Sequence, residues 1–304
     1  MLPLFILIIS YFDTFIPVKH FFIYTFNSII IKIIDMKYLL VFYSGTNNTT
    51  FLTNKVKERF ENGGHNVDVY RINPLKIEKI DFSNYDVVGI GYPIYGFNMP
   101  GIVHKFLKKQ KFIKDQKYFI YKNSGETYAA NDTSSLALRN IIKRHKGRLT
   151  NEYHFIMPYN IHFRYDEKLI KEMLDVDNLL LDILYKEITE DIHNIRKYKL
   201  IYKMLNYPMR LTYIGGNINV LFYKINKEKC TKCGLCISKC QMNNIYKDNK
   251  GEIKFHNHCL MCMNCTLNCP KDAIRMGLFN SWRVNGPYNL AEIEKIELES
   301  PIIT

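Results

Sequence analysis

Two cysteine-rich stretches decide how this sequence is interpreted. Residues 230–240 read CTKCGLCISKC, and residues 259–270 read CLMCMNCTLNCP. Each contains the run C-x2-C-x2-C-x3-C, and the eight cysteines of the chain all lie in these two runs. Pro270 follows the second run, whereas Gln241 stands at the matching position after the first. This spacing is typical of segments that hold two cubane iron–sulfur clusters.

The spacing also predicts which cysteines share a cluster. The first three cysteines of a run lie on one short loop and can hold three corners of a cube, whereas the fourth reaches the other cube. The first predicted [4Fe-4S] cluster has as ligands Cys230, Cys233, Cys236 and Cys269. The second has as ligands Cys259, Cys262, Cys265 and Cys240. Ile245 and Ile274 each follow a fourth cysteine by five positions, so we expect each to shield its nearest cluster from water.

Two other interpretations of the cysteines fit less well. A structural zinc site takes four ligands, typically as two separated C-x2-C pairs, and does not need three cysteines at successive three-residue steps. A disulfide framework suits short secreted chains, and this chain has 304 residues. Residues 224–277 resemble the small α+β ferredoxin domain that carries two [4Fe-4S] clusters. Clusters of this kind also imply a reducing compartment, so we expect a cytoplasmic location.

Composition and charge bound the remaining possibilities. A chain of 304 residues with 47% hydrophobic residues is long enough for two domains and is not disordered. The formal net charge is +13, and residues 224–277 alone hold ten Lys or Arg against four Asp or Glu. A positive surface there would attract a redox protein partner with an acidic docking face. Nucleic acid is the alternative partner of a basic chain, but no recognised nucleic-acid-binding signature supports it.

Residues 1–35 form an apolar extension. Met1 to Ser10 are almost wholly apolar, but Asp13 and Pro17 interrupt the continuation, and a spanning helix needs about 20 predominantly apolar residues. A secretory signal would begin with a positive region and end at a small-residue cleavage site, and neither is found. A weak membrane anchor, an irregular extension and a wrongly chosen start remain, and we favour Met36 as the start. Membrane association is not expected unless residues 1–35 are an anchor.

Apolar strand-like segments alternate with helical patterns from Met36 onward. We predict strands at residues 38–43, 66–71, 86–92, 117–122 and 153–157, and helices at residues 48–61, 100–109 and 132–145. This alternation predicts an α/β domain at residues 36–160 with a doubly wound, parallel, five-stranded sheet. Such sheets bind ligands at the carboxyl ends of their strands.

The loop after the first predicted strand has the composition of an anion site. It reads SGTNNT, from Ser44 through Gly45, Thr46, Asn47 and Asn48 to Thr49. Backbone N–H groups at a helix start, together with hydroxyl groups, can hold a phosphate. An ordinary capped helix start is the alternative. The loop lacks the lysine of a P-loop, which argues against a nucleotide triphosphatase.

The domain resembles flavodoxin, whose phosphate loop has the form S/T-x-T-G-N-T. Ser44, Thr46, Asn48 and Thr49 match this form, and Asn47 replaces the glycine, a change that asparagine tolerates because it visits left-handed conformations. The resemblance implies that residues 44–49 bind the phosphate of FMN. It also implies that two further loops flank the isoalloxazine ring, with the residues Pro93, Ile94, Tyr95 and Gly96 in one and Asn123, Ser124 and Gly125 in the other. Tyr95 is the candidate for ring contact, and a packing tyrosine is the alternative.

The rest of the chain connects these parts. We assign residues 161–223 to a helical and connecting segment, with a long helical region of one or two helices at 166–197 and with Pro208 and Gly215-Gly216 as breaks. We assign residues 278–304 to a C-terminal tail. The span from Met36 to about Tyr288 resembles flavodoxin–ferredoxin fusion proteins. That resemblance implies electron transfer between two [4Fe-4S] clusters and FMN, and no catalytic residue is predicted. A flavin-dependent reductase of a small molecule and a cluster-based redox sensor are the alternatives.

Overall fold

The buried stretches of the sequence form one parallel sheet in the computed structural model, which describes residues 36–296. The strands are β1 (Lys37–Phe42), β2 (Asn66–Arg71), β3 (Val87–Pro93), β4 (Lys117–Ser124) and β5 (Arg148–Ile156). Their order is β2-β1-β3-β4-β5, and every neighbouring pair is parallel. This is the strand order of the flavodoxin-like doubly wound fold, so the predicted fold class is confirmed. The predictions for residues 1–35 fall outside the described residues.

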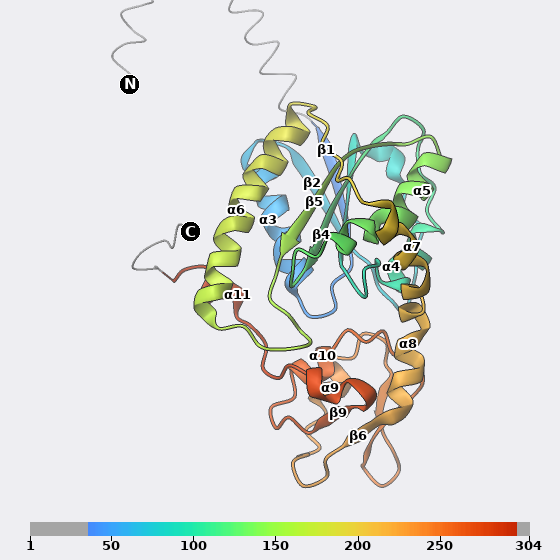
Figure 1. Ribbon diagram of the computed structural model, residues 1–304, viewed down its shortest axis with the longest axis vertical. Helices are drawn as coiled ribbons and strands as arrows, with labels where there is room; N and C mark the ends of the chain where they lie inside the picture. The colour runs from blue at the N-terminus through green and yellow to red at the C-terminus, as the bar shows by residue number, and fades with distance from the viewer. Residues whose placement is uncertain (1–35, 297–304) are drawn as a thin grey trace, which may run out of the picture.

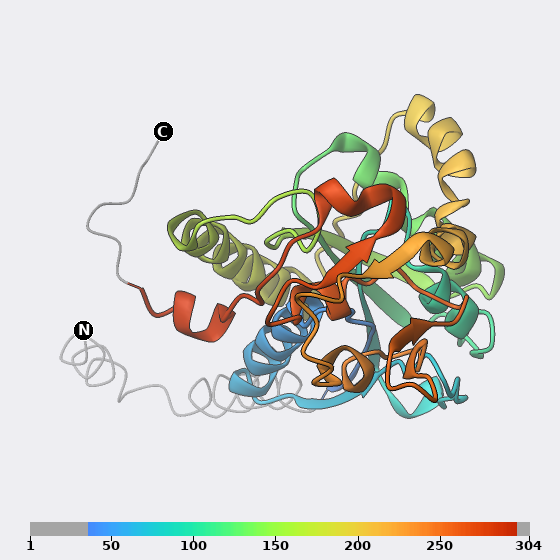
Figure 2. The same cartoon turned by 90° about the horizontal axis from the view of Figure 1, so that it is seen from below.

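Helices cover both faces of the sheet (Figures 1 and 2). They are α3 (Asn48–Asn62), α4 (Gly101–Leu107), α5 (Leu136–Arg144) and α6 (Glu167–Thr189). Successive side chains of a strand point to opposite faces. Leu39 and Val41 accordingly pack with α4 and α5, whereas Leu40 and Phe42 pack with α3 and α6.

Three predicted boundaries in or beside this domain are wrong. Helix α5 begins at Leu136, after a short 3-10 helix at Ala129–Ser135, whereas its predicted start is at residue 132. Strand β5 begins at Arg148, five residues before the predicted start, because its polar side chains are buried with partners: the Thr150 hydroxyl donates to the carbonyl of Tyr118. The predicted helical region 166–197 ends at Thr189. Beyond it, the backbone of Asn194 exchanges hydrogen bonds with Thr150 and Glu152 at the edge of β5. The open sheet edge therefore holds this segment in an extended form.

Two helices lead from the sheet to the small domain. These are α7 (Leu200–Met209) and α8 (Thr212–Asn219). Pro208 lies in the last turn of α7, but Gly215 and Gly216 lie inside α8, so the prediction that the glycines break a helix is wrong. A Cβ on Gly216 would lie 2.1 Å from the carbonyl oxygen of Cys259. Glycine at this position lets the helix approach a cysteine loop.

The small domain consists of two short helices and two antiparallel strand pairs. The strands are β6 (Tyr223–Ile225) paired with β9 (Ile274–Met276), and β7 (Ile245–Lys247) paired with β8 (Ile253–Phe255). The helices are α9 (Leu235–Ser238) and α10 (Asn264–Leu267), one in each cysteine run. The chain then returns to the sheet domain, where α11 (Leu290–Ile293) packs against α6 through Ile170 and Leu174. The carboxyl ends of the parallel strands face the small domain (Figure 1).

Candidate cofactor site

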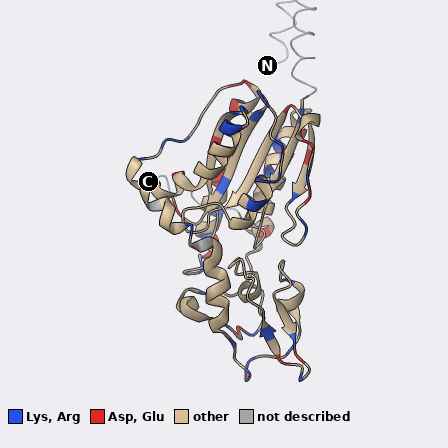
Figure 3. Ribbon diagram, turned by 90° about the vertical axis from the view of Figure 1, so that its right-hand side faces the viewer, with Lys and Arg blue, Asp and Glu red and all other residues tan. Residues whose placement is uncertain are grey.

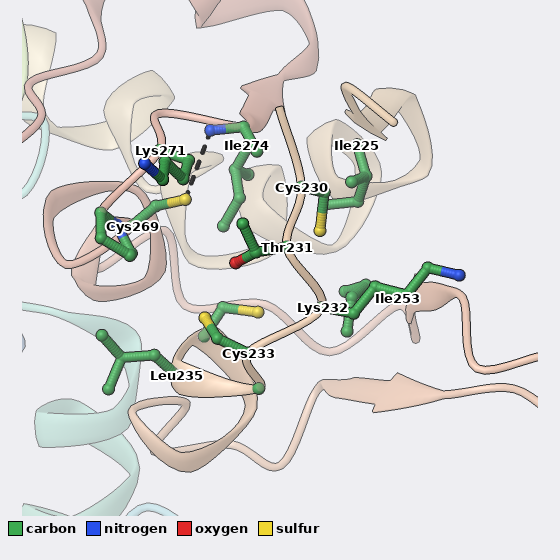
Figure 4. Close-up of a pocket in the computed structure, with 14 residues that line it drawn as sticks. Ile225, Cys230, Thr231, Lys232, Cys233, Leu235, Ile253, Cys269, Lys271 and Ile274 are labelled. Atoms are coloured by element: carbon green, nitrogen blue, oxygen red, sulfur yellow. Dashed lines mark hydrogen bonds between the residues drawn. The ribbon is translucent and has the colours of Figure 1, made fainter. Parts of the chain in front are cut away.

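One cavity of the small domain is lined by four cysteines from both runs. They are Cys230, Cys233, Cys236 and Cys269. The cavity has an empty volume of ≈ 380 Å³, and Ile225, Ile253 and Ile274 give it an apolar lining. Figure 4 shows the sulfur atoms around this space. Cys233 is exposed, so one side of the cavity borders solvent.

A second cavity of similar size is lined by the other four cysteines. They are Cys240, Cys259, Cys262 and Cys265, and the empty volume is ≈ 460 Å³. Its remaining lining is mainly apolar and includes Val220, Tyr223, Ile245 and Phe255. The structure thus groups the cysteines into the same two sets of four that the spacing predicts. Ile274 lines the first cavity and Ile245 the second, where each can exclude water.

The loops of the two runs are bent by left-handed residues that direct the sulfur atoms inward. Lys232 and Gly234 have positive φ in the first run, and Met261 and Met263 have positive φ in the second. Backbone N–H groups donate to three of the sulfur atoms, each at 3.3 Å, namely those of Cys240, Cys259 and Cys269. Such bonds favour the thiolate form, which is the form that binds iron.

The electrostatics of the cavities suit a positively charged group. Burial, together with the neighbouring sulfur atoms, raises the pKa of Cys236 to about 11 and that of Cys262 to about 12. Buried thiols such as these two become thiolates more readily when a cation lies beside them. Within residues 36–296, no group of three or more His, Cys, Asp or Glu side chains meets around a point that could hold a single metal ion. The four cysteines of each set instead line one cavity, as the ligands of a [4Fe-4S] cluster would.

The loop after β1 has the local geometry of an anion site. Asn47 is left-handed, with φ 77°, at the start of the 15-residue helix α3, and no side chain caps that helix. Among the described residues, the buried Ser44 hydroxyl has no hydrogen-bond partner. Thr49 donates to the side chain of Asn123, and Asn48 donates to the carbonyl of Pro158. A hydroxyl without a partner beside an uncapped helix start fits a bound phosphate.

This loop lies directly against the second cysteine cavity. A Cβ on Gly45 would lie 2.7 Å from the Cβ of Cys262 and 2.6 Å from the hydroxyl oxygen of Tyr95. The Gln241 side chain donates to the carbonyls of Ser44 and Gly45 at 2.9 and 3.0 Å. The predicted phosphate loop and the second set of cysteines are therefore in van der Waals contact.

The other two predicted flavin loops lie at the same sheet edge. Tyr95 and Asn98 form a tight turn through mutual backbone hydrogen bonds, and the N–H of Ile94 donates to the carbonyl of Asn123. The hydroxyl of Ser124 bonds to His154 at 2.7 Å. The first loop and the cysteine loop enclose the phenol of Tyr95, whose pKa is raised well above its usual value by burial. Its contact with a flavin ring stays a prediction.

Three residues near these loops were not predicted. Tyr159 packs its ring against Gly125, and the Asn160 side chain donates to the hydroxyl of Thr46. Both follow β5, whose carboxyl end lies at the binding edge, so strand order alone could have indicated them. The sequence marks Gln241 only as the departure from proline in the internal repeat, and its contact with the loop at residues 44–49 was not predicted.

Comparisons with known proteins support the assignment of the small domain. Residues 229–274 match the family model of the 4Fe-4S dicluster domain. The prediction of an iron–sulfur segment is confirmed. A search of curated proteins finds no match.

Similar solved structures cover the sheet domain. One is a short-chain flavodoxin associated with a non-canonical PDU bacterial microcompartment, with 16% identity and a TM-score of 0.40 over 52% of this chain and 99% of that chain. Another is a flavodoxin from the domain Archaea, with 13% identity and a TM-score of 0.37 over 52% and 99%. A third is the general stress protein 14 from Treponema denticola in complex with FMN, with 17% identity and a TM-score of 0.36 over 49% and 99%. The fold assignment rests on the strand order, and the chain joins a sheet of flavodoxin-like topology to a dicluster domain.

Proposed function

We propose that this protein is an electron-transfer iron–sulfur flavoprotein that relays electrons between two [4Fe-4S] clusters and FMN. The ligands of the first cluster are Cys230, Cys233, Cys236 and Cys269, and those of the second are Cys259, Cys262, Cys265 and Cys240. FMN lies on the three loops at the carboxyl edge of the sheet, with its phosphate on residues 44–49. A cubane cluster carries single electrons, and a flavin can exchange one or two.

The contact between Gly45 and Cys262 carries this proposal. It joins the loop predicted to hold FMN to a loop predicted to hold a cluster, without intervening chain. Cys233 is exposed, whereas Cys262 lies against Gly45 of the loop at residues 44–49. This difference supports an order in which electrons pass between solvent and the first cluster, then the second cluster, then FMN.

Several residues position the second cluster and FMN next to each other. Gln241 links the loop of the first cysteine run to the loop at residues 44–49 through its two hydrogen bonds. The Ser44 hydroxyl is available to a phosphate oxygen. The apolar lining of both cavities, including Ile245 and Ile274, excludes water and so influences the reduction potentials.

The partner that we propose is a redox protein with an acidic docking face. The exposed Cys233 lies in a cavity whose lining also contains Lys232 and Lys271. Charged residues lie at the tip of the small domain farthest from the sheet (Figure 3), and Lys and Arg exceed Asp and Glu by ten to four within residues 224–277. This net positive charge would increase the rate of encounter with an acidic partner, although Lys232 itself is paired with Glu252.

Anaerobic purification tests the proposal. The protein should contain about eight irons and as many sulfides per chain, with FMN and a broad visible absorption. Cys233→Ala should lose about half of the iron and keep the second cluster. Colourless protein, or protein that contains zinc instead, would contradict the cluster assignment. Steady turnover with quinones, nitro compounds or metal ions would instead indicate a small-molecule reductase.

A further inference from the structure

Helices α7 and α8 present an apolar face to solvent. They follow one another down one side of the molecule, from the sheet to the dicluster domain (Figure 1). Large apolar residues repeat along them at alternating steps of four and three, at Leu200, Met204, Tyr207, Leu211, Ile214 and Ile218. Each of these side chains is at least half exposed. This is the spacing of one helix face.

Two buried asparagines help to pack these helices against the protein, beside the ring of Tyr213, which contacts Gly101 and His104. Asn206 donates to the carbonyls of Phe97 and Thr133, and Asn219 donates to the carbonyl of Met276. Gly216 lies against the cysteine loop, as described above. An ordinary surface helix turns its apolar face to the core, whereas these helices expose most of their large apolar side chains.

The exposed apolar residues of α7 and α8 continue onto the short helix η3 (Val220–Phe222), and we call the whole surface the α7–α8–η3 face. Helix η3 follows α8 and adds Leu221, which is 68% exposed. Asn219 accepts a hydrogen bond from the N–H of Leu278, which brings the exposed Leu278 beside this end of the face. A contiguous exposed apolar surface of this extent indicates a contact with something apolar outside the chain.

The charges around the face indicate the occupant. Residues 192–227 contain seven Lys or Arg and no Asp or Glu. Lys197, Lys199 and Lys203 are exposed at the start of the face. A basic amphipathic helix of this composition suits an anionic lipid surface, into which the apolar face inserts while the lysines meet the head groups.

We propose that the α7–α8–η3 face binds the surface of an anionic membrane. A second copy of the chain fits less well, because two such faces would bring like charges together. The exposed Ile201 and Phe222 also make the apolar surface wider than the contact surface of a coiled-coil helix, which argues against helix pairing between two copies. No helix within residues 36–296 is long and apolar enough to cross a bilayer, so the contact would be one that lies on the surface. This observation is separate from residues 1–35, on which the earlier expectation about membranes rested.

Cosedimentation of the cluster-loaded full chain with lipid vesicles tests the proposal. Vesicles of phosphatidylglycerol and phosphatidylcholine should bind the protein, and vesicles of phosphatidylcholine alone should bind it much more weakly. Added salt should weaken the binding. The double variant Leu211→Asp/Leu221→Asp should reduce the affinity by about tenfold or more, because two apolar contacts are replaced by charges repelled by the head groups.

A matched control comes from helix α6, where Val176 and Leu179 are 62% and 67% exposed among acidic neighbours. Val176→Asp/Leu179→Asp should leave binding unchanged. Visible absorption checks that each variant retains its clusters. A second face variant, Lys199→Glu/Lys203→Glu, should also weaken vesicle binding, and it leaves the apolar residues unaltered. No vesicle binding, or binding that survives both face variants, would overturn the proposal. The proposal would also be overturned if the protein binds no vesicles but forms a dimer that Leu211→Asp/Leu221→Asp dissociates.

Discussion

Two adjacent glycines in α8 should respond in opposite ways to the same substitution. A Cβ on Gly216 would lie 2.1 Å from the carbonyl oxygen of Cys259 and 3.0 Å from its carbonyl carbon. A Cβ on Gly215 would meet nothing within 4 Å. Both glycines lie inside the same helix, so alanine should relieve the same conformational cost at each position.

The magnitudes follow from the two geometries. Replacing a glycine in a helix interior with alanine contributes about 0.5–1 kcal/mol of stability. The added methyl at Gly216 meets backbone that cannot rotate away, and overpacking of this kind costs about 1–3 kcal/mol. The stability that alanine adds in a helix interior is the same in both variants, so it cancels when they are compared. Their difference should therefore be about 1–3 kcal/mol, with Gly215→Ala the more stable.

Loss of visible absorption in denaturant under anaerobic conditions measures this difference as a rate. If the whole penalty appears in the unfolding rate, Gly216→Ala should lose its clusters roughly 5- to 150-fold faster than Gly215→Ala. Iron analysis before denaturation shows whether the second cluster is already lost. Equal rates, or a faster loss in Gly215→Ala, would refute the packing of α8 against the cysteine loop.

Three other substitutions probe the rest of the fold. Burial raises the pKa of Asp177 to about 8, so the folded state keeps a proton that the unfolded state releases near pH 4, and stability should fall as pH rises between these values. Asp177→Asn should make the unfolding midpoint less dependent on pH over this range. An unchanged pH dependence would contradict this assignment. Glu152→Gln leaves the fully buried Lys122 and the nearby Arg139 without their shared carboxylate, which should cost about 3–5 kcal/mol in urea unfolding. A variant as stable as the parent would argue against this buried network. Gln241→Ala removes both hydrogen bonds to the loop at residues 44–49, each of which contributes about 0.5–1.5 kcal/mol. Deuterium exchange of the backbone amides in this loop should become faster, without loss of iron. Unaltered exchange would show that other contacts hold the loop.

The regular parts of the fold could be predicted because they repeat locally. Buried parallel strands such as β1 and β4 are continuous apolar runs, and their predicted bounds differ from the structure by two residues at most. The start of β5 was missed because Thr150 and Glu152 are polar, and their burial depends on partners in β4. The end of α6 was missed because the edge of β5 competes for the backbone that follows.

The grouping of the cysteines could be predicted for a chemical reason. Three ligands at steps of three residues can face one cavity only from a single bent loop, and this spacing is a property of the sequence. The left-handed Asn47 could likewise be anticipated from the phosphate loop that the segment resembles.

The sequence by itself determined the strand pattern, the two sets of cysteines and the basic character of residues 224–277, since each depends on residues close together along it. The tertiary structure alone decided that Gly45 meets Cys262, that Gln241 joins the two domains and that α7 and α8 turn their apolar face outward. These features join segments far apart in the chain, and their positions depend on how whole elements pack. No local pattern of residues contains that information.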